Sequence, residues 1–190
     1  MNMYVKLKSI TILLISVLLT SCVAAVVAGA AVGMVYDRRS VTTMEADARI
    51  YHVVRKNIVS DPQFRSSRIL VSSFNRVVLL VGQTPTASLR VVAERVAQNT
   101  PGVVRVYDEI SVDTPLSVEQ RTKDSWITSQ VRSNMLTKKG LESGSIRIVT
   151  ENGVVYLMGI VSAEQGSLAV DVARRVNGVK KVVKIFQYIH

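Results

Sequence analysis

Few residues of this 190-residue chain are of the types that carry out covalent chemistry. Its one cysteine is Cys22, and its two histidines, His52 and His190, lie far apart in the sequence. No Gly-x-Ser-x-Gly, Ser-x-x-Lys or His-Glu-x-x-His motif occurs, and the acidic residues show no spacing typical of a carboxylate pair. A single cysteine excludes an intrachain disulfide and a cysteine-rich metal cluster. We therefore expect a protein that is not an enzyme, with no catalytic residue, no metal site and no cofactor.

Cys22 stands at the end of a segment with the pattern of a secretion signal. Two lysines precede an apolar stretch from Ile10 to Leu19, which is the usual length for such a signal. Small residues then lead into the cysteine, and the resulting stretch Leu19-Thr20-Ser21-Cys22 resembles the lipobox of bacterial lipoproteins. The resemblance implies a signal peptide at residues 1–21 and acyl chains on Cys22, which becomes the new N-terminal residue after cleavage.

An uncleaved membrane helix is the alternative, because no charge interrupts residues 9–36 and this length could span a bilayer. Ala and Gly dominate after Cys22 and would make a weak spanning segment, which favours the lipoprotein. Val23 follows the cysteine, and in bacterial lipoproteins a residue other than Asp there favours the outer membrane. We expect a lipid-anchored protein on the periplasmic face of the outer membrane, with residues 22–43 forming the lipidated cysteine and a flexible tether.

The charge balance indicates an anionic partner. The chain has 24 Lys and Arg against 14 Asp and Glu, a net charge of +10. This charge attracts either nucleic acid or a phospholipid surface, and the net charge alone does not distinguish the two. Nucleic acid is scarce in the periplasm, so the secretion signal favours anionic lipid, and we expect no nucleic-acid partner.

The only tryptophan, Trp126, adjoins a helical pattern with Ile127, Val131 and Met135 on its apolar face. At 100° per residue, Trp126 projects about 140° away from the centre of that face. A large aromatic side chain on the exposed face of a helix could insert among phospholipid headgroups, or it could pack against another part of the chain. The candidate phospholipid-binding residues are Trp126, Thr122, Lys123, Ser129, Arg132 and Ser133.

The chain contains an internal repeat. A shift of 77 residues aligns Asp47, Ile50, Val54 and Gly82 with Asp124, Ile127, Val131 and Gly159, and Gly102 then meets Gly178 at a shift of 76. The copies cover residues 44–113 and 121–190, joined by a linker at 114–120 that is too short for free swinging. Arg49 is the counterpart of Trp126, so only the second copy has an aromatic residue there.

Each copy has the pattern of helix, strand, strand, helix, strand. In the second copy a helix is expected from about Ser117 to Leu136, a hairpin turn at Asn152-Gly153, and a buried central strand at Val154–Met158. Asn75-Arg76 is a poorer turn in the first copy, because Arg disfavours positive φ. Gly82 and Gly159 are expected to end the central strands, where the following helix approaches closely or a turn leaves no room for a side chain. The fold class is α+β, with two tandem modules, each a small mixed sheet covered by two helices.

This strand-Gly-helix-Gly-strand pattern, present twice behind a lipobox, resembles the BON-domain family of periplasmic proteins. The stretches that carry the resemblance are Cys22-Val23-Ala24-Ala25, Arg39-Ser40-Val41, Val78-Leu79-Leu80-Val81-Gly82-Gln83, Trp126-Ile127-Thr128, Val131-Arg132-Ser133, Thr150-Glu151-Asn152-Gly153, Leu157-Met158-Gly159 and Arg175-Val176.

The resemblance implies an outer-membrane lipoprotein that supports membrane integrity and gathers at division sites. It also implies that the first helix of the second module binds an anionic phospholipid such as phosphatidylglycerol, which favours lipid as the contact of Trp126. Further expected partners are periplasmic envelope or peptidoglycan-remodelling proteins. The alternative function is that of an adaptor that binds another periplasmic protein, with incidental lipid contact.

Overall fold

The computed structural model describes residues 37–189, and the chain from Arg38 onward forms one compact unit. The expected signal peptide, Cys22 and most of the tether lie outside the described residues. Within residues 37–189, no helix combines the length and apolar character needed to cross a membrane. The same residues contain no cluster of His, Cys, Asp and Glu side chains that could hold a metal ion.

The first module begins at α2 (Val41–Ser60), where the Ser40 hydroxyl accepts a hydrogen bond from the Thr43 amide at 3.1 Å. This cap starts the helix three residues before the expected module boundary, inside the segment taken as tether. The later elements are η1 (Pro62–Phe64), β1 (Arg68–Phe74), β2 (Val77–Thr84), α3 (Ala87–Gln98) and β3 (Arg105–Val112).

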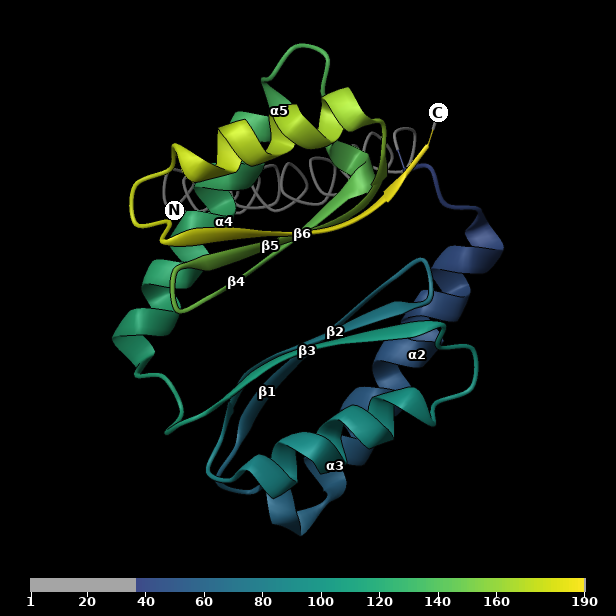
Figure 1. The fold of residues 1–190 in the computed structure, drawn as a ribbon, viewed down its shortest axis with the longest axis vertical. Coiled ribbons are helices and arrows are strands. Elements are labelled where there is room, and N and C mark those ends of the chain that lie inside the picture. The colour runs from purple at the N-terminus through teal and green to yellow at the C-terminus, as the bar shows by residue number, and fades with distance from the viewer. Residues whose placement is uncertain (1–36, 190) are drawn as a thin grey trace, which may run out of the picture. The chain divides into compact units, whose positions relative to one another are not determined.

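The second module repeats this order (Figure 1). Its helix α4 (Val118–Leu136) is capped by the Ser117 hydroxyl, so the last three residues of the expected linker belong to the helix. The other elements are η2 (Ser143–Ser145), β4 (Ile146–Glu151), β5 (Val154–Val161), α5 (Ala163–Arg174) and β6 (Lys181–Tyr188). The predicted α+β fold of two tandem modules is confirmed.

Both sheets are mixed and have the same strand order. In the first, β2 is central, antiparallel to β1 and parallel to β3; in the second, β5 has the same place between β4 and β6. The helices of each module cover one face of its sheet, and the predicted core residues Ile127, Val131 and Met135 are at most 3% exposed. Equal strand orders are what the duplication predicted.

Two glycines permit close backbone approach at equivalent places. Gly82 has a φ of +134°, and a Cβ atom there would lie 2.0 Å from the carbonyl oxygen of Arg68. At Gly159 a Cβ atom would lie 2.7 Å from the carbonyl oxygen of Ser145. The sequence expectation that the following helix or a turn approaches these glycines was wrong, because the close backbone belongs to the neighbouring antiparallel strand or to the residue just before it, and both glycines lie two residues inside their strands.

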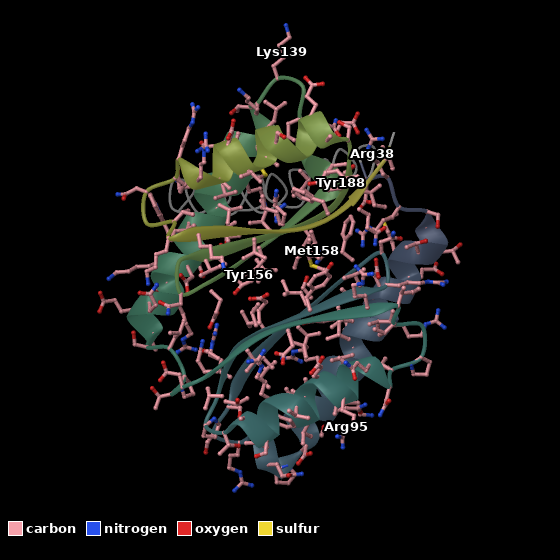
Figure 2. All side chains as sticks on the ribbon, in the orientation of Figure 1. Arg38, Arg95, Lys139, Tyr156, Met158 and Tyr188 are labelled. Atoms are coloured by element: carbon pink, nitrogen blue, oxygen red, sulfur yellow. The ribbon has the colours of Figure 1, made fainter. Side chains whose placement is uncertain are left out.

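The second face of each sheet is also buried, because the two sheets pack against each other. Leu79 and Val81 of β2 share a buried cluster with Tyr156 and Met158 of β5, and Figure 2 shows the latter two projecting from their strand toward the first module. Helices therefore lie outside and sheets inside, and all eight residues of β2 are buried. This sheet-to-sheet contact was not predicted.

A polar cluster forms at the margin of this intermodule core. Glu151 Oε1 accepts hydrogen bonds from Arg68 Nη1 at 2.6 Å and from Gln83 Nε2 at 2.8 Å. Glu151 is only 5% exposed, so these bonds satisfy one oxygen of a carboxylate that would otherwise be costly to bury. They fix one edge of the second sheet to the first module.

Candidate functional site

Trp126 lies on the outer face of α4 and is 50% exposed, whereas its neighbour Ile127 is 3% exposed. The exposure expected from helical periodicity is therefore confirmed. Among the described residues, the intermodule core is built from strands and includes no residue of α4. The structure thus leaves the tryptophan ring accessible to a partner outside the chain.

Three of the expected hydroxyl residues surround Trp126. Thr122, Ser129 and Ser133 are exposed and lie within about 60° of it around the helix axis. Thr122 Oγ1 donates to the Val118 carbonyl at 2.9 Å, and Ser129 Oγ donates to the carbonyl one turn earlier at 3.0 Å. Because these donors are used by the helix, the hydroxyls offer a ligand mainly their acceptor lone pairs.

The expected cations of α4 are less favourably placed. Lys123 Nζ lies 2.7 Å from Glu119 Oε1, and this ion pair lowers the pKa of Glu119 through a hydrogen bond and charge attraction. Arg132 is exposed but projects about 120° around the helix from Trp126. The structure therefore brings the hydroxyls to Trp126, gives Lys123 an acidic partner, and leaves Arg132 on a different face.

The buried carboxylate of Asp124 positions α4. No role for this residue was predicted from the sequence. Asp124 is 4% exposed, and its two oxygens accept the backbone N–H groups of Asn152 and Gly153, each at 2.8 Å. These bonds hold the helix against the β4–β5 hairpin turn, two residues from Trp126. Charge-assisted bonds of this kind are stronger than neutral ones.

Asp47 makes the equivalent helix-to-turn hydrogen bonds in the first module. Its oxygens accept the backbone N–H groups of Asn75 at 2.6 Å and Arg76 at 2.8 Å, and it also pairs with Arg39 at 2.8 Å. This explains how Arg76 is held at a φ of +62°, which the side chain disfavours. The sequence contained a signal for both sets of hydrogen bonds, because the repeat aligns Asp47 with Asp124 on a helix face that is otherwise apolar.

Comparison with known proteins decides the family. Residues 46–114 and 123–189 each match the family model described as BON domain. The chain belongs to the BON-domain family.

Three relatives extend this result. The chain is 36% identical to the outer membrane lipoprotein DolP of Haemophilus influenzae, over 96% of its own length and 97% of the relative's. It is 37% identical to the 21 kDa hemolysin of Actinobacillus pleuropneumoniae, over 80% and 79% of the two chains. It is 30% identical to the osmotically-inducible protein Y of Escherichia coli, over 72% and 69%. The similarity to DolP supports the expected class, an outer-membrane lipoprotein with BON domains.

The two BON modules differ in charge. Residues 121–190 contain eleven basic and five acidic side chains, a net charge of +6, whereas residues 44–113 contain nine and seven, a net charge of +2. The excess positive charge therefore lies in the module that also presents the exposed tryptophan. An exposed aromatic side chain in a module of net positive charge is a combination also found in proteins that bind the membrane interface.

Proposed function

We propose that this protein is anchored to the periplasmic face of the outer membrane through Cys22 and binds anionic phospholipid through α4 of its second BON module. The observation that carries the proposal is the 50% exposure of Trp126, the only tryptophan of the chain, in the module of higher positive charge. A surface of this kind is attracted to an anionic headgroup layer and can insert one ring into it.

The magnitudes suit a second, reversible contact. Burial of one large aromatic side chain contributes at most about 3 kcal/mol, and each basic group near an anionic surface contributes about 1 kcal/mol. This sum is weak for a protein free in solution. It is sufficient once acyl chains on Cys22 confine the modules close to the bilayer, because the effective concentration of membrane is then high.

The hydroxyls beside Trp126 favour phosphatidylglycerol as the lipid. The hydroxyl hydrogens of Thr122 and Ser129 are bonded within the helix, so these side chains can offer a ligand only their oxygen lone pairs. The glycerol headgroup of phosphatidylglycerol supplies O–H donors for such acceptors, and its phosphate supplies the negative charge. Through this contact the protein would support outer-membrane integrity, at division sites in particular, together with periplasmic envelope or peptidoglycan-remodelling proteins.

Vesicle partitioning tests the proposal. Residues 22–190 with Cys22→Ala are mixed with phosphatidylglycerol vesicles or with phosphatidylcholine vesicles, and bound protein is measured by sedimentation. Binding should require phosphatidylglycerol and weaken with salt, and the emission of Trp126 should shift to shorter wavelength because the ring leaves water. Trp126→Ala should weaken binding at least tenfold, whereas Arg49→Ala, at the equivalent position of the first module, should change it less than threefold.

The same experiment separates the adaptor function. An adaptor that binds a periplasmic protein would give no vesicle binding and an unchanged Trp126 spectrum, and this result would overturn the proposal. Equal effects of Trp126→Ala and Arg49→Ala would also overturn it, because binding would then depend on general charge and not on α4.

A further inference from the structure

The membrane contact of α4 has an aromatic side chain but lacks a free cation beside it. Lys123 is paired with Glu119 at 2.7 Å, and Arg132 projects to another face of the helix. A headgroup phosphate next to the ring of Trp126 therefore needs a positive partner from another element. This need for a cation depends on the membrane contact proposed above for α4.

The end of α5 lies beside the part of α4 that carries Trp126. A Cβ atom at Gly178, just after α5, would lie 3.1 Å from Ile127 Cδ1, and one at Gly140, just after α4, would lie 3.7 Å from Leu168 Cδ1. The two helices thus run antiparallel, side by side over their sheet, as Figure 1 shows. Ile127, and with it Trp126, therefore lies level with the segment that follows the C-terminal end of α5.

Trp126 projects outward, on the side of α4 that is nearer to α5. On one side of Ile127, Thr128 Oγ1 donates to Thr150 Oγ1 of β4 at 2.7 Å, so that side of α4 faces the edge strand. Trp126 lies about 100° from Ile127 in the opposite sense. It therefore projects outward and away from β4.

Arg175, the C-cap residue of α5, projects outward, on the side of α5 that is nearer to α4. It lies about 20° around the helix axis from Leu168, whose side chain faces the segment that follows α4. Arg175 is exposed, and within residues 37–189 its side chain makes no ion pair and no hydrogen bond. Its neighbour Arg174 differs, because it points to the other side and pairs with Asp171 at 2.9 Å.

The two modules differ at both positions. The first module keeps the same helix contact, since a Cβ atom at Gly102 would lie 3.6 Å from Ile50 Cδ1. The counterparts of Trp126 and Arg175 there are Arg49 and Asn99. The second module therefore presents an aromatic ring and an unpaired guanidinium on the outer surfaces of two neighbouring helices. The first module has no aromatic residue at the first of these positions and no guanidinium at the second.

We propose that Trp126 and Arg175 form one phospholipid site, in which Arg175 binds the headgroup phosphate while the tryptophan ring inserts beside it. A guanidinium suits this role because it stays charged and donates two parallel hydrogen bonds to phosphate oxygens. The site lies across α4 and α5, so the lipid-binding surface extends beyond the single helix expected from the sequence.

A pair of neighbouring substitutions tests this assignment. Arg175→Gln and Arg174→Gln remove the same charge from adjacent positions of one helix end, and both side chains are exposed, so both variants should keep the wild-type unfolding temperature. With residues 22–190 carrying Cys22→Ala and phosphatidylglycerol vesicles, Arg175→Gln should raise the lipid concentration for half-maximal binding about fivefold, which corresponds to 1 kcal/mol. Arg174→Gln should raise it less than twofold, and Arg175→Lys should fall between wild type and Arg175→Gln.

The emission of Trp126 gives a second readout, because no other tryptophan contributes. Arg175→Gln should reach the same blue-shifted spectrum as wild type, but at the higher lipid concentration. Equal effects of the two Gln variants would overturn the role of Arg175 and leave the proposed membrane function standing, provided that Trp126→Ala still weakens binding at least tenfold. If Trp126→Ala, Arg175→Gln and Arg174→Gln all bind the vesicles as tightly as the wild type, the lipid contact lies outside α4 and the proposed function of α4 is overturned together with the site.

Discussion

Asp124→Ala should destabilise the second module while leaving the lipid-binding surface chemically intact. The substitution removes the acceptors of two backbone N–H groups, those of Asn152 and Gly153, at 2.8 Å each. Gly153 is buried, so its unsatisfied N–H costs about 1–3 kcal/mol, whereas the exposed Asn152 can bond to water and loses about 0.5–1.5 kcal/mol. Relief of the buried carboxylate offsets part of this loss, and we expect a decrease of about 2–3 kcal/mol in the free energy of unfolding.

Urea unfolding followed by circular dichroism measures this decrease, and amide hydrogen exchange locates it. The exchange of the Gly153 amide should accelerate more than that of amides in the β5 strand interior. Asp47→Ala should cost more than Asp124→Ala, because it also removes the Arg39 ion pair and the hydrogen bond from Ser73 Oγ. A loss below about 0.5 kcal/mol with an unchanged Gly153 exchange rate would refute the view that this carboxylate holds α4 to the hairpin.

Three further predictions concern other parts of the chain. Gly82→Ala should cost more than about 4 kcal/mol and yield little folded protein on expression, because its Cβ atom would lie 2.0 Å from the Arg68 carbonyl oxygen at a positive φ. Burial raises the pKa of Tyr156 to about 12 in the folded protein, whereas the phenol of the unfolded chain ionises near pH 10. The free energy of unfolding should therefore fall by about 2–3 kcal/mol as the pH rises from 10 to 12. Tyr156→Phe should remove most of that alkaline loss in urea titrations, whereas Phe at the exposed Tyr188 should not. Cys22→Ala should leave an unprocessed or soluble precursor, and mature-length protein in the outer-membrane fraction would contradict lipidation.

The sequence predicted the modules well because their periodicities are local. The spacing of Ile127, Val131 and Met135 marks a helix face, and Asn152-Gly153 marks a turn, without knowledge of distant residues. The exposure of Trp126 followed from the same arithmetic.

Long-range contacts were harder to predict from these patterns. The runs Val77–Val81 and Val154–Met158 are apolar at every position, which indicates strands buried on both faces, but not which surface covers the second face. The ion pair of Lys123 with Glu119, and the absence of an ion pair at Arg175 within the described part of the chain, depend on side-chain directions that the spacing of residues in the sequence does not reveal. Asp124 was visible in the repeat, yet its hydrogen bonds join a helix to a turn 28 residues away.

The sheet-to-sheet contact has an evolutionary consequence, because the two modules meet through equivalent faces. Leu79 and Tyr156 occupy the same position of the repeat, as do Val81 and Met158, and all four lie in the shared cluster. An interface in which each partner uses the same patch is that of a two-fold symmetric pair. A single ancestral module that paired with a copy of itself would already have possessed this surface. Gene duplication and fusion would then have freed the two halves to diverge, so that one now carries Arg49 where the other carries Trp126, while each continued to cover the other's apolar face.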